Sequence, residues 1–206
     1  MIITSNGSPR PLDAAALRSM FEARKQVFVD LLGWDVPVIE DKYEIDQFDD
    51  EHAYYLMIAD ERGDHLGSAR LLPTNRPHLL GDLFPELCAG PVPQGDGVEE
   101  ITRFCLGRNQ NAAGRRTTRN MLVSALVRSA LERGIHQFTG VAELSWLQQI
   151  LSFGWQCRPL GTPRRIGASM IGALAIDITP ETPALLAANN IWIDVEPRHL
   201  QILEAA

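Results

Sequence analysis

The stretch Val98-Glu99-Glu100-Ile101-Thr102-Arg103-Phe104 decides how the rest of the chain is interpreted. Its alternating pattern predicts a β-strand, entered from Gln94-Gly95-Asp96-Gly97 and followed by apolar residues. One face would carry Val98, Glu100, Thr102 and Phe104, and the other Glu99, Ile101 and Arg103. Charged groups in such a strand are costly to bury unless they are paired or used. The stretch is therefore either an edge strand with solvated charges or part of a functional site.

The composition indicates an ordinary globular protein. The 206 residues, 45% hydrophobic and 22% charged, suit a single domain spanning 1–206. No apolar run reaches the roughly 20 residues that a membrane span needs, and we see no secretory signal at Met1. Three scattered cysteines, Cys88, Cys105 and Cys157, indicate reduced packing residues of a cytoplasmic protein without a metal site.

Charge is distributed unevenly along the chain. Residues 1–104 hold 19 acids and 9 bases, a net charge of −10, whereas residues 105–206 hold 7 acids and 10 bases, a net charge of +3. The overall charge of −7 argues against a nucleic-acid-binding protein. The basic side is concentrated in six arginines: Arg108, Arg115, Arg116, Arg119, Arg128 and Arg133. The second half of the chain is therefore suited to an acidic partner.

Periodicity predicts helices and strands in alternation. Helices are expected over residues 14–32, 79–87, 117–133, 144–153 and 180–190, strands over 53–59, 66–72, 98–104, 135–141 and 171–178, and loops over 39–51 and 109–114. No repeat or linker divides the chain. The expected fold class is α/β (α+β), a single domain with a mixed twisted sheet flanked by helices.

Three arginines lie where the local pattern expects burial. Arg24 falls on the apolar face of the first helix, Arg70 interrupts an apolar strand, and Arg103 lies in the central strand. Three carboxylates are the expected counter-charges: Asp46, Asp49 and Glu100. A structural network is one account, but buried ion pairs contribute little net stability. A cleft that holds a charged, zwitterionic small molecule explains the set better.

The motifs that the sequence lacks exclude several reaction types. The sequence has no Gly-x-Ser-x-Gly nucleophile motif, no paired Cys and His, and no phosphate-binding or dinucleotide-binding glycine pattern. Direct group transfer remains, with a carboxylate as the proton acceptor. Glu100 is the candidate for that role.

Several short motifs occur in an unbroken order over about residues 20–105. They are Arg24-x-x-x-Phe28, Trp34, Glu44-x-Asp46-x-Phe48-Asp49, Tyr55-Leu56, Arg70-Leu71-Leu72-Pro73-Thr74 and Glu100-Ile101-Thr102-Arg103-Phe104. Together they resemble the acyl-homoserine-lactone synthases, the autoinducer synthases of bacterial quorum sensing. Thr102 stands where many members have Ser. The C-terminal half is similar only in outline.

The resemblance implies a fold akin to the GCN5-related N-acetyltransferases and a specific reaction. A fatty acyl group would pass from a carrier thioester to the amine of S-adenosylmethionine, and lactonisation would then release methylthioadenosine. No cofactor is expected to be bound; S-adenosylmethionine is a co-substrate. By position in the motifs, the catalytic and charged frame would be Glu100, Arg103, Asp46, Asp49 and Arg70, and the substrate-binding residues Arg24, Phe28, Trp34, Thr102, Phe104 and Ala142.

The resemblance also gives the basic segment a function. Acyl carrier protein is acidic, so Arg108, Arg115, Arg116 and Arg119 would form its docking site. A solvated helix start is the alternative, and an acyl-coenzyme A donor would suit the same charges. Members that favour 3-oxo chains often carry Thr at the position of Ala142, so an unsubstituted or 3-hydroxy chain is expected.

Two other functions stay open. One is an N-acetyltransferase that uses acetyl-coenzyme A on another amine, although the segment 108–114 is a poor version of that family's pyrophosphate loop. The other is a non-catalytic module that binds an acyl or adenosyl ligand.

Overall fold

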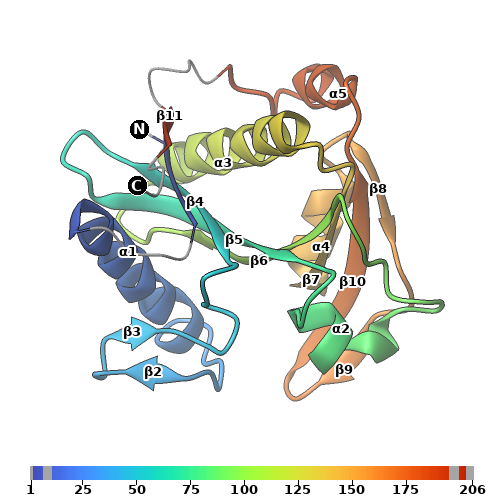
Figure 1. Ribbon diagram of the computed structural model, residues 1–206, viewed down its shortest axis with the longest axis horizontal. Helices are drawn as coiled ribbons and strands as arrows, with labels where there is room; N and C mark the ends of the chain where they lie inside the picture. Colours follow the sequence, from blue (N-terminus) through green and yellow to red (C-terminus); the bar gives the residue numbers. More distant parts are fainter. Residues whose placement is uncertain (1, 7–10, 195–199, 203–206) are drawn as a thin grey trace. The chain divides into compact units, whose positions relative to one another are not determined.

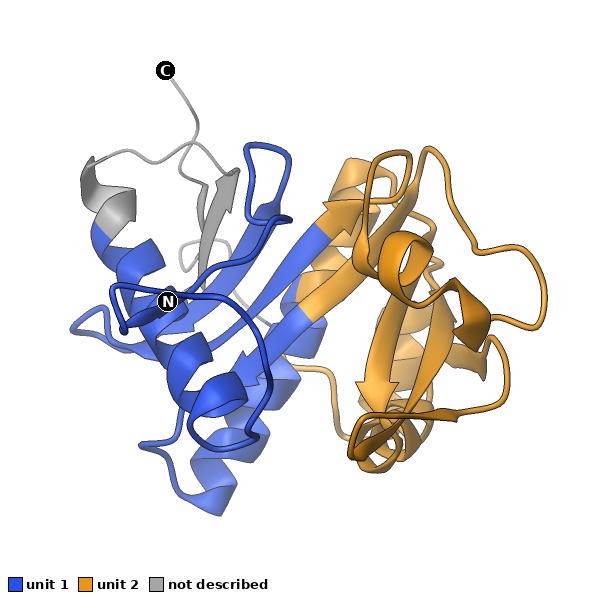
Figure 2. Cartoon of the chain, turned by 90° about the horizontal axis from the view of Figure 1, so that it is seen from below, with its two compact units in different colours: residues 1–71, 103–125, 194–206 blue, residues 72–102, 126–193 orange. Residues whose placement is uncertain are grey.

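The computed structural model describes residues 2–6, 11–194 and 200–202. Its internal contacts group the chain into two compact units (Figure 2). Unit 1 comprises residues 1–71, 103–125 and 194–206, and unit 2 comprises residues 72–102 and 126–193. Three elements have residues in both units: strand β5 (His65–Pro73), strand β6 (Val98–Leu106) and helix α3 (Ala112–Arg133).

Unit 1 contains strands of a mixed sheet. Strand β1 (Ile2–Asn6) pairs in parallel with β11 (Leu200–Ile202) and antiparallel with β4 (Tyr54–Ala59), which pairs antiparallel with β5. Helix α1 (Pro11–Arg24) packs on this sheet through an edge-to-face contact of Phe21 with Tyr55, whose ring centroids are 6.0 Å apart.

The strands of unit 2 also pair in both directions (Figure 1). Strand β6 pairs in parallel with β7, and β10 pairs antiparallel with β7, β8 and β9. The strands are β7 (Gln137–Glu143), β8 (Gln156–Pro159), β9 (Arg164–Ile166) and β10 (Ser169–Asp177). The helices are α2 (Leu79–Leu83), the short 3-10 helix η2 (Pro85–Leu87), α4 (Leu144–Leu151) and α5 (Thr182–Ala188). The expected class, a mixed sheet flanked by helices, is confirmed.

The main elements agree with the sequence-based expectation, and one boundary differs in a way that affects the site. Helix α3 begins at Ala112 rather than near Thr117, so the loop expected over 109–114 is shorter. The reason is a helix cap: the side chain of Asn111 accepts a hydrogen bond from the backbone N–H of Gly114 at 2.8 Å. No helix in the described ranges is long and apolar enough to cross a membrane.

The segment expected to be an acidic loop contains a hairpin. Strands β2 (Val38–Ile39) and β3 (Tyr43–Glu44) pair antiparallel, and the turn places Glu40 at φ +54° and Asp41 at φ +53°. Two consecutive positive φ values define the type of turn that normally carries Asn-Gly. The backbone is therefore strained at Glu40 and Asp41.

Relieving that strain should stabilise the protein. We expect Glu40→Asn combined with Asp41→Gly to raise the free energy of unfolding by about 0.5–1 kcal/mol, because Asn and Gly adopt positive φ more readily. Denaturant unfolding measures the change. Glu51→Gly is the control, since Glu51 is exposed but lacks a positive φ. An equal gain in the control would contradict the explanation.

Candidate active site

A short π-helix directly follows Arg24 in unit 1. Residues Lys25–Val29 form element η1, in which Asp30 N–H reaches Lys25 O at 3.1 Å, five residues back. A π-turn is rare and is often found at functional sites. Here it places Phe28 in a buried position, where its ring stacks on that of Trp34 with centroids 4.7 Å apart.

Three arginines and three carboxylates of unit 1 form a closed ring in which the charges alternate. Its order is Arg24, Glu44, Arg103, Asp46, Arg70, Asp49 and back to Arg24. Arg24 donates through Nε to Glu44 Oε2 at 2.6 Å. Its Nη1 and Nη2 donate to the two oxygens of Asp49, both at 2.8 Å. This two-fold contact is the strong, planar geometry that guanidinium groups allow.

The other two arginines complete the ring. Arg103 Nη2 lies 2.8 Å from Glu44 Oε1 and 2.7 Å from Asp46 Oδ2. Arg70 Nη1 lies 2.6 Å from Asp46 Oδ1 and 2.8 Å from Asp49 Oδ1. Every carboxylate therefore contacts two arginines, and the ring has no net charge. The three arginines converge as the sequence predicted.

Opposite charges keep Arg24 and Asp49 ionised. Burial alone would raise the pKa of the Asp49 carboxyl, but Arg24, Arg70 and the backbone N–H of Asp46 outweigh burial and hold this pKa well below the usual range. Burial alone would lower the pKa of Arg24, but Asp49 and Glu44 outweigh burial and raise this pKa above its ordinary value. Burial and the Asp49 charge raise the pKa of the Tyr55 hydroxyl. At neutral pH Arg24, Asp49 and Tyr55 therefore do not exchange protons, which gives them a structural role rather than that of an acid or base.

Arg103 differs from the other two arginines. Its backbone has φ +48°, a conformation that is energetically costly for residues other than glycine. Its guanidinium carbon lies 5.6 Å from the ring centre of Phe28 and 5.9 Å from that of Trp34. The hydrogen bonds of Arg103 within the described residues use Nε and Nη2, which leaves Nη1 without a protein acceptor there. Nη1 is thus available to an anionic ligand.

Glu100 lies in unit 2 and is fully buried. Both of its carboxylate oxygens lie 3.1 Å from the backbone N–H of Leu80, at the start of α2. Its neighbour Glu99 instead pairs with Arg133 of α3 through Nη1 at 2.7 Å. Consecutive residues of β6 therefore face opposite sides of the sheet, as the alternation predicted. A buried carboxylate can accept a proton from an amine that comes within hydrogen-bond reach.

The ring contains one carboxylate that was not among the expected counter-charges. Glu44 joins Asp46 and Asp49 in the ring. Glu44 was quoted in the motif but was not assigned a partner, because it lies in an acidic segment without a periodic pattern. Its 0% exposure is produced by the β2–β3 hairpin, which the sequence analysis did not predict. Tyr55, which donates to Asp49 Oδ1 at 2.8 Å, was missed in the same way.

The remaining expected residues fall in different places. Thr102 is buried and belongs to unit 2, and Phe104 is half-buried and belongs to unit 1. Ala142 of β7 is buried; the alternation of the strand places it on the face opposite to Thr139. Arg108, Arg115, Arg116 and Arg119 lie in unit 1, just before and within the first half of α3.

A mixed α/β fold whose sheet carries a buried carboxylate is suited to direct transfer of an acyl group to an amine. The structure agrees in fold with an acyl-CoA N-acyltransferase from Pseudomonas aeruginosa, with a TM-score of 0.55, 14% identity, and coverage of 87% of this chain and 99% of that chain. The fold class is therefore that of the N-acyltransferases, as expected.

More specific relatives identify the family. The model for the autoinducer synthase family matches residues 10–184. An acyl-homoserine-lactone synthase of Ralstonia nicotianae (strain ATCC BAA-1114 / GMI1000) is 36% identical over 184 residues, which is 86% of this chain and 88% of the relative. A CoA-dependent acyl-homoserine lactone synthase, solved with MTA and with SAM and isopentyl-CoA, has a TM-score of 0.86 at 25% identity and covers 100% of this chain and 94% of its own. The chain belongs to the autoinducer synthase family, whose members make acyl-homoserine lactones.

Proposed function

We propose that this protein transfers a fatty acyl group from a thioester donor to the amine of S-adenosylmethionine and then closes the lactone with release of methylthioadenosine. The observation that carries the proposal is Glu100, a fully buried carboxylate of β6 anchored by the N–H of Leu80. The family supports the substrates, since one relative has been solved with SAM and isopentyl-CoA.

The chemistry assigns Glu100 the role of proton acceptor. A protonated amine has no lone pair for the attack, so the amine first gives a proton to Glu100, directly or through water, and its nitrogen then attacks the thioester carbonyl carbon. The C–N bond forms, the C–S bond breaks, Glu100 returns its proton to the departing thiolate, and the second proton of the nitrogen is released to water. In the second step the substrate carboxylate attacks the carbon next to the sulfonium, and methylthioadenosine leaves.

The charge ring supports S-adenosylmethionine as the substrate through Nη1 of Arg103, which is not used in the hydrogen bonds of Arg103 within the described residues. Arg103 Nη1 is proposed to bind the substrate carboxylate, while Phe28 and Trp34 pack against the adenosyl part. The substrate is a sulfonium cation that also bears a carboxylate, so it requires both a donor and a polarisable aromatic surface. Arg24, Arg70 and the ring carboxylates, together with Phe104, are proposed to frame this site in unit 1.

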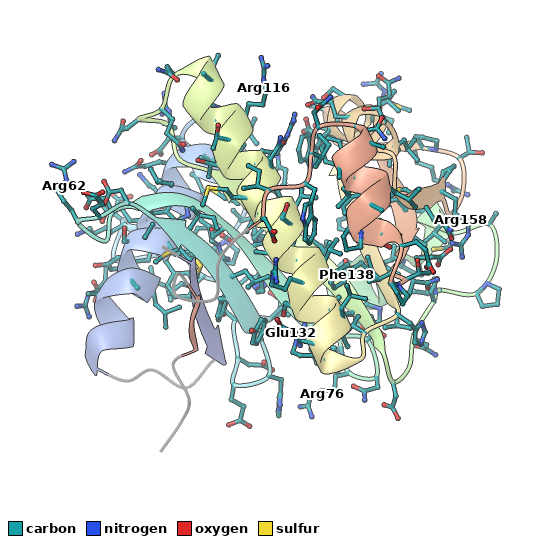
Figure 3. All side chains as sticks on the ribbon, turned by 90° about the horizontal axis from the view of Figure 1, so that it is seen from above. Arg62, Arg76, Arg116, Glu132, Phe138 and Arg158 are labelled. Carbon is teal, nitrogen blue, oxygen red and sulfur yellow. The ribbon has the colours of Figure 1, made fainter. Side chains whose placement is uncertain are left out.

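The acyl donor is proposed to dock on the first half of α3. Residues 105–125 contain four arginines and no acidic residue, and Figure 3 shows Arg116 standing out from this part of the helix. Burial and the neighbouring charge of Arg116 lower the pKa of Arg119, as expected where like charges are gathered. An acidic carrier protein or the phosphates of coenzyme A fit this surface.

Reversing two of these charges tests the docking. We expect Arg115→Glu with Arg116→Glu to lower kcat/KM for an acyl carrier donor by about 10-fold or more, and to make the rate less sensitive to salt. Arg164→Glu with Arg165→Glu is the matched control, because it makes the same charge change at exposed residues of unit 2. Equal losses in the two variants would contradict a specific docking surface on α3.

The proposal also covers the acyl chain of the donor and the location of the protein in the cell. We propose an unsubstituted or 3-hydroxy chain, because the methyl group of Ala142 offers no hydrogen bond to a 3-oxo group. A cytoplasmic location is proposed, since acyl carrier protein and S-adenosylmethionine are found there.

Turnover in a defined mixture distinguishes the candidate functions. The protein is incubated with S-adenosylmethionine and an acyl carrier or acyl-CoA thioester, and the products are identified by mass spectrometry. Acyl-homoserine lactone with an equal amount of methylthioadenosine supports the synthase. Acylation of another amine without methylthioadenosine would indicate a general N-acyltransferase, and no turnover would indicate a binding module.

A further inference from the structure

Thr139 of β7 lies beside Glu100 in the sheet of unit 2. Strands β6 and β7 run parallel, and their register pairs Glu100 with Thr139 and Glu99 with Phe138. Residues paired across a sheet point to the same face, so Thr139 shares the face of Glu100 rather than that of Glu99. Figure 1 shows these two strands next to each other. The proposed base and this hydroxyl are therefore neighbours.

The Thr139 hydroxyl has no hydrogen-bond partner among the described residues. The residue is 0% exposed, and its Oγ1 is buried without a hydrogen bond in the described part of the protein. Buried polar groups are nearly always paired, since an unpaired one loses its contacts with water and gains nothing in return. Val in its place would fill the same volume at no such cost. The hydroxyl of Thr139 therefore has a hydrogen bond to offer to a bound molecule.

Apolar residues also lie on this face of unit 2. Val141, two residues further along β7, packs against a cluster that contains Leu80, Leu87 and Ala173, each 0% exposed. Leu80 is also the residue whose N–H holds Glu100. Hydrogen bonds are strengthened in such surroundings because little water competes with them.

We propose that the Thr139 hydroxyl donates a hydrogen bond to the thioester carbonyl oxygen as it becomes an oxyanion. This inference rests on the proposed acyl transfer. When the amine, having given a proton to Glu100, attacks the carbonyl carbon, the C=O π electrons move onto oxygen. The negative charge on oxygen is held by Thr139 until the C=O bond re-forms and the thiolate leaves with the proton from Glu100. The thioester carbonyl would thus react next to a base on β6, Glu100, and a hydrogen-bond donor on β7, Thr139.

Thr139→Val separates this role from a structural one. We expect kcat to fall by about 10²–10³-fold, as for removal of one oxyanion donor, with KM for both substrates within about 2-fold of wild type. The melting temperature should stay the same or rise, because no hydrogen bond of the resting protein is lost. Thr139→Ser should recover most of the rate. The loss should be equal for unsubstituted and 3-oxo donors, because the thioester carbonyl is common to both.

Thr182→Val is the matched control, and we expect it to affect stability rather than turnover. Thr182 is also 0% exposed and in unit 2, but its Oγ1 accepts a hydrogen bond from Thr179 N–H at 2.9 Å. This variant should lose several degrees of melting temperature, about 2–8 °C, and keep its kcat.

Three results would overturn the inference: unchanged kcat in Thr139→Val, a clear fall in its melting temperature, or a loss confined to 3-oxo donors. The last would make Thr139 a group that recognises the acyl substituent. If the wild-type protein itself makes no lactone, the proposed function fails. Lactone from wild type with an unaffected Thr139→Val rejects this inference alone.

Discussion

Asp49→Asn is expected to destabilise the protein by about 3–5 kcal/mol. Asp49 is the carboxylate that joins Arg24 to Arg70 in the ring, and the side chains of all three are at most 1% exposed. Removing its charge leaves the ring with a net positive charge where water cannot compensate. Asn is nearly the same size, so the loss reports on charge rather than on packing. Urea unfolding at pH 7 measures it.

The neighbouring residue provides the control. Asp50→Asn makes the same change at an exposed position and should alter stability by less than about 0.5 kcal/mol. The pKa of Asp49 is lowered by folding, so its contribution is present above the ordinary carboxyl pKa of 3.8 and is lost as acid protonates it. The difference between wild type and Asp49→Asn should therefore shrink in acid. Similar stabilities for the two variants at pH 7 would show that the ring is not an integral part of the fold.

Glu100→Gln should lower kcat for acyl transfer by about 10²–10⁴-fold while the protein stays folded. The amide oxygen of Gln can still accept the hydrogen bond from Leu80 N–H, so the contact that anchors the side chain survives. What the variant loses is the capacity to take a proton from the amine. Steady-state rates together with circular dichroism separate the two effects.

The same strand supplies the control for this variant. Glu99→Gln makes an identical change one residue away, on the opposite face, where the partner is Arg133 of α3. It should retain most of the wild-type rate. Equal losses in both variants, or near-normal turnover in Glu100→Gln, would remove Glu100 from the role of base.

The buried arginines of the ring could be predicted from the sequence, because a charged residue is unusual on an apolar helix face or within an apolar strand. Arg24 on an apolar helix face, Arg70 in an apolar strand and Arg103 in the central strand each require a compensating charge, and the structure provides it. Thr139 lies in a strand that the sequence predicts, but its importance depends on the register with Glu100, which the sequence does not show.

Other features depend on local geometry that has little sequence signature. Glu44 joins the ring because a hairpin forms through a strained Glu40-Asp41 turn, where the usual Asn-Gly signal is missing. The φ of +48° at Arg103 interrupts the regular pleat of β6, so the alternation that correctly separates Glu99 from Glu100 does not extend to Arg103. Short strands such as β8 and β9 are specified by their pairing with β10 rather than by their own pattern.

The most direct test of the central claim is the signal that the protein produces. Cells lacking a synthase of their own are given either the wild-type gene or Glu100→Gln, and organic extracts of the cultures are analysed by mass spectrometry. We expect an acyl-homoserine lactone from wild type and almost none from Glu100→Gln. No lactone from the wild-type protein, present and folded in the same cells, would contradict the account.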